Sequence, residues 1–193
     1  MRQTGARAKV ERAALELFAA KGFDGVSIAE IAGAAGVGQG SLYRHYPSKQ
    51  DLAWALFSEA YLRTGAQLDA IRASEPRFDK RIAAMIAHFC AIYDGDPALF
   101  RFMLLAQHDL LPRLRSEDRT PVTVIEDAVR EAVAARQIAA VDASGAAAVI
   151  LGIVLQTCIF HVYGKIQDRL STRAPYLASA AIAAVEALGR ARQ

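Results

Sequence analysis

The sequence predicts an all-α protein, and three observations support that fold class. Apolar residues recur three and four positions apart along most of the chain, which is the spacing of one face of a helix. Runs in which β-branched and polar residues alternate, as half-buried strands require, are absent from the sequence. Residues that start and stop helices stand where the apolar period restarts. With 193 residues, 53% hydrophobic and 22% charged, the chain suits one or two domains and is too apolar to be disordered.

The first two helices are bounded by clear signals. Apolar residues at helical spacing predict a helix over about 6–21, and Gly22 ends it. The tetrapeptide Ser27-Ile28-Ala29-Glu30 has the pattern of a capping box, in which the serine hydroxyl and the glutamate carboxylate satisfy open backbone N–H groups. We therefore expect a short second helix to begin at Ser27 and to end at Gly36.

The next two helices follow within a few residues. A third short helix is expected over about 38–46, where Pro47 stops it because the residue before a proline is pushed out of the helical region. Ser48-Lys49-Gln50-Asp51 is a second capping box, and it opens a longer helix over about 48–72. Two capping boxes so close together make the boundaries of these elements firm.

In the remainder of the chain we expect four or five more helices. Asp96 and Pro97 form a cap followed by a first-turn proline, and Thr120-Pro121 starts a helix in the same way. The expected ranges are 78–93, 98–107, 120–136, 142–171 and 176–190.

The stretch from Ala143 to Gly164 carries no charge over 22 residues and admits two interpretations. It is long enough to span a membrane. An apolar helix of a soluble protein that is buried in a core or in a subunit interface has the same composition, and we favour this second interpretation. No apolar run follows the first residues, so we expect no signal peptide. Two cysteines are too few for a disulfide framework and fit a reducing cytoplasm.

The net charge of +3 is unevenly distributed. Residues 1–50 contain seven basic and four acidic side chains (7 − 4 = +3), whereas residues 51–193 contain 16 of each sign. A basic N-terminal quarter on a neutral body is typical of a module that faces a polyanion, although an ordinary solvated helix face gives the same count.

The residues between Ile28 and Tyr46 have the pattern of a helix-turn-helix, whose second helix enters the DNA major groove. Gly36 stands where the chain must turn sharply and a positive φ is expected. Ala32 lies four residues earlier, where a bulky side chain would push the two helices apart. The buried contacts expected to fix the angle between the helices come from Ile31, Ala35, Val37 and Leu42.

The outward side chains of the second of these helices suit DNA. None is acidic, and Gly40 lets the backbone come close to a base edge. Gln39 and Ser41 can read base edges, while the longer side chains of this region can reach phosphates. Ser27 offers its hydroxyl and backbone N–H groups to a phosphate at a helix N-terminus. The candidate DNA contacts are Ser27, Gln39, Gly40, Ser41, Tyr43, Arg44, His45 and Lys49.

The stretch from Val26 to Leu52 resembles the N-terminal domain of TetR-family transcriptional regulators, and Glu11 to Ser27 resembles that family's first helix and following loop. The pattern Gly-x-Leu-Tyr-x-His-aromatic followed by Ser-Lys is more specific than a bare helix-turn-helix. The resemblance covers about the first 60 residues. It implies a DNA-binding domain over 1–52, a connecting helix over 48–72, and a helical effector-binding and dimerisation domain over 53–193.

The resemblance also implies the role of each candidate. Ser27 and Lys49 would bind phosphates, and Gln39, Gly40 and Ser41 would face bases. Tyr43 and His45 would contact the backbone or thymine methyls. Apart from the resemblance, we expect Arg44 to be a solvated flank that adds only general electrostatics. Tyr46 would pack the third helix on the core, with its hydroxyl a further candidate for DNA contact. Three positions depart from the common pattern, because Ser27, Gly38 and Gln39 stand where threonine, serine and lysine are frequent.

For the larger domain, the resemblance implies a homodimer through the last two helices, packed as a four-helix bundle. The two DNA-binding domains of such a dimer predict a palindromic operator on double-stranded DNA. The resemblance further implies a small-molecule effector and a repressor that it releases. Candidate pocket residues, which ordinary core packing would equally explain, are Met85, His88, Phe89, Tyr93, Phe100, Met103, Gln107, Phe160 and His161.

Other functions would place different demands on the sequence. A DNA-binding dimer with an architectural or protein-partner role would need no effector and would have a filled cavity. An enzyme would need a catalytic constellation, and the sequence shows no phosphate-binding loop and no supported cysteine–histidine pair. The histidine and cysteine spacings match no metal motif, so we expect neither metal nor cofactor. A membrane-anchored regulator is the remaining alternative; we expect a cytoplasmic protein.

Overall fold

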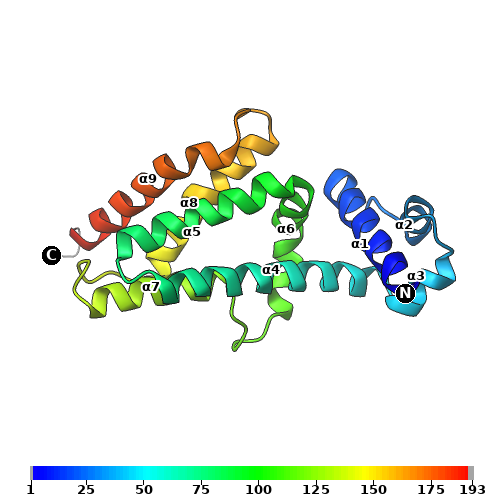
Figure 1. The fold of residues 1–193 in the computed structure, drawn as a ribbon, viewed down its shortest axis with the longest axis horizontal. Coiled ribbons are helices and arrows are strands. Elements are labelled where there is room, and N and C mark those ends of the chain that lie inside the picture. The colour runs from blue at the N-terminus through cyan, green and yellow to red at the C-terminus, as the bar shows by residue number, and fades with distance from the viewer. Residues whose placement is uncertain (1, 191–193) are drawn as a thin grey trace. The chain divides into compact units, whose positions relative to one another are not determined.

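The computed structural model describes residues 2–190, and the side chains of residues 5–190. This part of the chain forms nine α-helices and no strand, which confirms the predicted fold class (Figure 1). The helices are α1 (Arg2–Lys21), α2 (Ile28–Ala35), α3 (Gln39–His45), α4 (Lys49–Ser74), α5 (Phe78–Gly95), α6 (Pro97–Leu110), α7 (Pro121–Ala134), α8 (Ala143–Val162) and α9 (Leu170–Arg190), with a short 3-10 turn at Leu111–Arg113 after α6.

The chain divides into two compact units. The first contains the residues up to Tyr61 together with Asp96–Asp118, and the second contains Leu62–Gly95 together with the residues from Arg119 onward. Helix α4 therefore contributes its first half to one unit and its second half to the other. The sequence did not predict that α6 joins the N-terminal helices.

The first unit is built around α1, which packs against α2, α3 and α6. Phe18 of α1 and Phe102 of α6 are buried and stack with ring centroids 5.6 Å apart. Leu42 of α3 and Phe57 of α4 complete the core from the other side and have no exposed surface. Burial of each such side chain contributes about 1.5–3 kcal/mol to folding, so this core fixes the position of the short helices.

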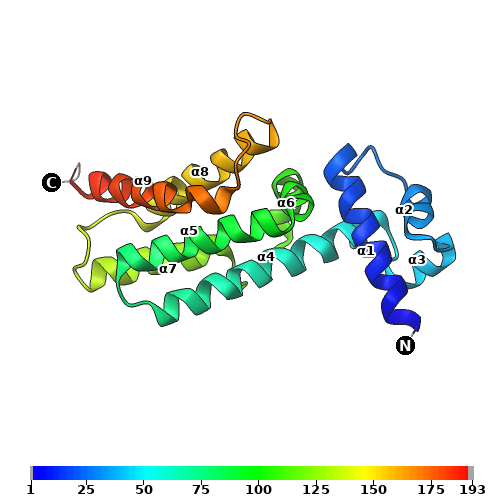
Figure 2. The same cartoon turned by 45° about the horizontal axis from the view of Figure 1, so that its top comes forward.

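The second unit packs α5 and α8 against α9, and α7 against α8 (Figure 2). Its core contains Ile82, Val124, Ile150 and Leu170, which are almost completely buried. Thr120 caps α7 as the Thr-Pro pair predicted, because its hydroxyl accepts a hydrogen bond from the Thr123 N–H at 3.1 Å.

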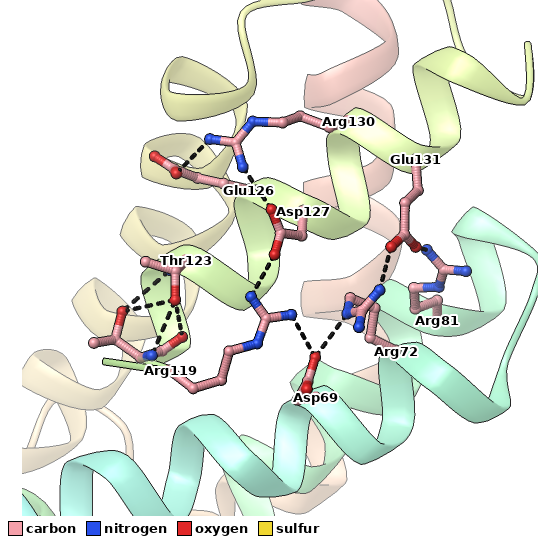
Figure 3. Close-up of polar contacts among 10 residues, drawn as sticks. Asp69, Arg72, Arg81, Arg119, Thr123, Glu126, Asp127, Arg130 and Glu131 are labelled. Carbon is pink, nitrogen blue, oxygen red and sulfur yellow. Dashed lines mark hydrogen bonds and ion pairs between the residues drawn. The ribbon is translucent and has the colours of Figure 1, made fainter. Parts of the chain in front are cut away.

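An ion-pair cluster joins the second half of α4 to α7 within the second unit (Figure 3). Arg119 binds both Asp69 and Asp127, and Asp69 also accepts from Arg72 at 2.7 Å. The Glu131 carboxylate accepts hydrogen bonds from Arg72 and, at 2.8 Å, from Arg81, whose side chain is largely buried. The hydrogen bond from Arg119, with that from Arg72, lowers the pKa of Asp69 to about 2. This network ties α4 to α7 at several points.

The boundary between the last two helices differs from the sequence prediction. The helix expected to continue to about Ser171 ends at Val162, and the final helix begins at Leu170 instead of Tyr176. Gly164 adopts a left-handed backbone with φ of 68°, which stops α8. The Asp94 carboxylate then accepts hydrogen bonds at 2.9 Å from the N–H groups of Leu170 and Ser171, so α9 is capped from outside its own sequence.

Candidate nucleic-acid interface

The start of α2 is closed by the predicted capping box. The Ser27 hydroxyl accepts from the Glu30 N–H at 3.2 Å, and the Glu30 carboxylate accepts from the Ser27 N–H at 2.8 Å. That backbone hydrogen bond, followed by the one from Lys21, lowers the pKa of Glu30 to about 2. Ser27 is exposed, but its hydroxyl and its own N–H are both engaged by Glu30.

The turn between α2 and α3 has the geometry that the sequence predicted. Gly36 lies in the left-handed region with φ of 65° and ψ of 35°, where a side chain would be strained. Its N–H and that of Val37 bond back to carbonyls near the end of α2. Ala32 and Ala35 are buried beneath the turn, so their small side chains set how closely the two helices approach.

Helix α3 has one anchoring residue and an outward face. Leu42 is completely buried, whereas Gln39, Gly40 and Arg44 are exposed. The Tyr43 side chain is 49% exposed although it is large and aromatic. Ser41 and His45 are half-buried at the edges of this face. The interior therefore does not take up the side chains that were predicted to read DNA.

The N-terminus of α3 is open. Gly38, in an extended conformation, is the N-cap and provides no side-chain hydrogen bond, as expected from the loss of a capping hydroxyl there. A Cβ placed on Gly40 would meet nothing within 4 Å, so the backbone at this position is free of cover from the rest of the chain. A flat, uncovered first turn can approach a duplex closely.

Tyr46 holds the end of α3 on α1. Its ring is buried, and its hydroxyl donates to the Glu11 carboxylate and accepts from Arg7 Nε at 3.2 Å. Arg7 also binds Glu11 at 2.7 Å. Burial, with the neighbouring Glu11 carboxylate, raises the pKa of Tyr46 to about 12. The hydroxyl is thus used inside the protein, in keeping with a packing role for this residue.

Lys49, predicted to bind a phosphate, makes intramolecular contacts. Its ammonium group donates to the carbonyl oxygens of Phe23 and Val26, each at 2.9 Å, and lies 4.3 Å from the centre of the Phe23 ring. These contacts fasten the loop before α2 to the first turn of α4. Sequence reasoning missed this role because it depends on carbonyl groups 26 and 23 residues earlier in the chain.

The start of α4 is capped by Ser48, whose hydroxyl accepts from the Asp51 N–H at 3.0 Å and donates to the Asp51 carboxylate at 2.7 Å. The predicted helix start is correct. Within the described residues, the Ser48 N–H does not donate to the Asp51 carboxylate. The second half of the expected capping box is replaced by the hydrogen bond that the Ser48 hydroxyl donates to this carboxylate.

The candidate effector residues are distributed over both compact units. Phe100, Met103 and Gln107 belong to α6 in the first unit, and the other six lie on α5 and α8 in the second. Met85 and Phe89 line a cavity of only about 10 Å³, the volume of one water probe. Tyr93 is buried and shares a hydrogen bond of 2.8 Å with His161.

The two remaining candidates are more accessible. His88 Nε2 lies 3.2 Å from the Gln67 side-chain oxygen on α4, and Phe160 is 46% exposed on α8. Some of the nine residues thus lie in a core, some lie at the surface, and some form hydrogen-bonded pairs. They do not together line one cavity within a unit.

The two cysteines are buried, and burial raises the pKa of the Cys90 thiol to about 11 and that of Cys158 to about 12. Such thiols are protonated at neutral pH and are poor nucleophiles. Within residues 5–190, no three histidine, cysteine or acidic side chains gather as metal ligands.

The family model for bacterial regulatory proteins of the tetR family matches residues 12–56, which contain α2, the glycine turn and α3. Residues 12–56 therefore match the DNA-binding domain of the TetR family. The match begins within α1 and ends in the first half of α4, and the helical body that follows has the architecture of TetR regulators over nearly its whole length. The proteins that this family model describes are bacterial regulatory proteins.

Individual relatives agree with this family. A protein of Mycobacterium tuberculosis designated as a mycofactocin biosynthesis transcriptional regulator, MftR, is 40% identical over 74 residues, which are 38% of this chain and 37% of that relative. The chain therefore matches little more than a third of the curated relative's length.

Two solved structures extend the likeness in fold. The TetR-family regulator PfmR of Thermus thermophilus has a TM-score of 0.74 at 19% identity, with 90% of this chain and 96% of that chain covered. The regulator FadR of Bacillus subtilis, solved in complex with stearoyl-CoA, has a TM-score of 0.75 at 17% identity, with 91% and 97% covered. At these identities the likeness establishes the architecture alone.

Proposed function

We propose that this regulator is a cytoplasmic, homodimeric repressor that binds a palindromic operator through α3 and is released by a small-molecule effector. In this proposal, residues 1–52 read DNA, and residues 53–193 provide dimerisation and effector binding. The observation that carries the DNA-reading part is the outward face of α3, which is free of acidic side chains and anchored by the buried Leu42.

The contacts proposed for DNA are Ser27, Gln39, Gly40, Ser41, Tyr43, Arg44, His45 and Lys49. Gln39 and Ser41 would hydrogen-bond to base edges, and Gly40 would allow close approach. Tyr43, Arg44 and His45 would contact the sugar-phosphate backbone. Lys49 would act mainly by holding the loop before α2, since its ammonium already has two carbonyl partners.

A gel-shift titration with the DNA upstream of the gene tests this assignment. Gln39→Ala should lower the preference for the correct base at one position by about 1–3 kcal/mol, and Tyr43→Ala should weaken binding to all sequences alike. Gln167→Ala, which changes an exposed glutamine between α8 and α9, is the matched control and should bind normally. Loss of binding in the control would contradict the assignment. So would unchanged binding and unchanged base preference in both Gln39→Ala and Tyr43→Ala.

The dimer proposal rests on the surface of α8 and α9. Helix α8 is long and apolar enough to cross a membrane. Only 28% of its most apolar 18-residue segment is buried within the chain. Phe160 and Tyr163 are 46% and 70% exposed. A soluble regulator rarely exposes so apolar a helix, and a second copy of the same face would cover it.

Sedimentation velocity tests the dimer. Phe160→Glu should shift the protein to a monomer, because two carboxylates would be buried across a two-fold axis. Leu105→Glu changes a leucine of α6 that is 55% exposed and should leave the dimer intact. If Leu105→Glu dissociates the dimer and Phe160→Glu does not, the interface lies elsewhere. Recovery of the wild-type protein in the membrane fraction would refute the cytoplasmic placement.

A second function has its own support. The cavity among α4, α5, α7 and α8 is filled by side chains to about 10 Å³, as expected of a DNA-binding dimer with an architectural or protein-partner role and no effector. An effector there requires the core around Phe89 to open, for which an elongated apolar ligand is the natural occupant. The stearoyl-CoA complex of the Bacillus subtilis protein makes acyl-CoA the first class to assay.

Thermal-shift and gel-shift titrations with acyl-CoA thioesters of increasing chain length, followed by native mass spectrometry of the purified protein, separate the two functions. Stabilisation with parallel release from DNA supports an effector. No bound small molecule and no release by any ligand would favour the architectural role.

A further inference from the structure

The first compact unit contains a cavity of about 360 Å³ that the proposed function does not use. It lies between α1, the start of α4 and α6. Its floor is buried and apolar, formed by Phe18, Ala53 and Phe102. None of the nine candidate effector residues lines it. Its volume is at the lower end of the range of small-molecule sites, roughly 300–1,000 Å³.

The rim of this cavity is charged. Asp24, in the loop after α1, and Asp109, near the end of α6, both line it and are both exposed. In the part of the chain that the structure describes, neither carboxylate takes part in an ion pair. Arg113, the one cation among the described lining residues, has its guanidinium 4.5 Å from the centre of the Trp54 ring. The lining thus carries two negative charges against one positive charge that is stacked on an aromatic ring.

We propose that this cavity is a binding site for small lipophilic cations. An aromatic or branched apolar body would lie on Phe18 and Phe102, and the ammonium group would remain at the rim that carries Asp24 and Asp109. An apolar floor favours the body by removing it from water, and aromatic faces also attract cations. A fatty acid or other apolar anion would meet two carboxylates and is disfavoured by the same charges.

The chain provides its own reporter for this site. Trp54 is the only tryptophan of the sequence, it follows the floor residue Ala53, and it lies under Arg113. A ligand in the cavity will therefore change the tryptophan emission of the full-length protein. This measurement needs no DNA and no dimer, so its outcome is independent of the proposed function.

The experiment titrates three probes of one skeleton, 4-phenylbutylammonium, 4-phenylbutanol and 4-phenylbutyrate, against the purified protein. The cation should bind most tightly and the anion most weakly. Asp24→Asn and Asp109→Asn should each weaken the cation about threefold to fivefold, as expected for an exposed ion pair, and should leave the alcohol unchanged. Glu117→Gln, an exposed carboxylate outside the lining, is the matched control and should bind the cation normally.

Ala106→Phe places a ring in the cavity and should abolish binding of all three probes, with circular dichroism confirming that the variant is folded. If Ala106→Phe is unfolded, the aspartate variants still decide the question, because they change charge and not volume. An unchanged emission with every probe, equal binding of alcohol and cation, or tighter binding of the anion would each overturn the proposal. So would an equal loss of affinity in Glu117→Gln.

Discussion

Gly65 of α4 offers the sharpest test of how the second unit is packed. It is buried in the middle of a helix, where alanine would ordinarily be the better residue by about 1 kcal/mol. A Cβ at this position would lie 2.9 Å from the Arg119 carbonyl carbon and 3.0 Å from that of Thr120, and closer still to the Arg119 oxygen. These are backbone atoms, which cannot rotate out of the way.

The size of the effect follows from these contacts. Ordinary contact begins near 3.4 Å, so the Arg119 carbonyl carbon would have to retreat by at least 0.5 Å (3.4 − 2.9), and the Arg119 oxygen, which lies closer, by more. That segment is held by the Thr120 cap of α7 and by the ion pairs of Arg119 with Asp69 and Asp127. Overpacking of a fixed site costs about 3 kcal/mol at the upper end of the usual range. After the helix-propensity gain of about 1 kcal/mol, Gly65→Ala should be less stable by about 2 kcal/mol.

Thermal unfolding followed by circular dichroism measures this. For a chain of this length, about 2 kcal/mol corresponds to a Tm lower by about 4–8 °C. Gly33→Ala in α2 is the matched control, because its Cβ would meet nothing within 4 Å, and it should raise the Tm by about 1–4 °C. If Gly65→Ala is as stable as Gly33→Ala, the close approach of α4 to the segment before α7 is wrong.

Three further outcomes are expected. Leu42→Ala, which empties a fully buried site, should destabilise the first unit by about 2–5 kcal/mol in urea unfolding, and a loss below about 1 kcal/mol would show that α3 is not anchored there. Tyr46→Phe should cost about 1 kcal/mol in the same assay, since Glu11 keeps Arg7 as a partner. The pKa of Asp69 is depressed in the folded state from 3.8 to about 2, so its stabilising contribution is present above about pH 4 and is lost as the pH falls toward 2. In Asp69→Asn, the free energy of unfolding should therefore fall less steeply between about pH 5 and pH 2 than in the wild type. An unchanged pH dependence would argue against the ion-pair cluster.

The elements defined by local signals could be predicted from the sequence. The capping box at Ser27, the left-handed turn at Gly36 and the cap at Thr120 each depend on residues within a few positions of one another. The buried position of Leu42 followed from the spacing of apolar residues in a helix-turn-helix. The outward face of α3 could therefore be predicted from the sequence alone.

Features that depend on partners distant in the sequence could not be predicted from it. The cap of α9 is the side chain of Asp94, 76 residues before Leu170, so nothing near Leu170 marked the helix start. The Lys49 ammonium was assigned to a phosphate because its carbonyl partners are invisible in sequence. The packing of α6 on α1, and with it the cavity above Phe18 and Phe102, likewise arises only in three dimensions.

The anchoring of Lys49 has a consequence for how the proposed dimer would respond to the spacing of two half-sites. Its side chain fastens the segment between Phe23 and Val26 to the beginning of α4. The α2–α3 pair consequently cannot swivel on α4 as a loosely tethered module would. In the proposed dimer, an operator whose halves are one base pair too far apart would therefore be accommodated by bending of the DNA or by distortion farther along α4. Both penalties would sharpen discrimination without a single additional base contact.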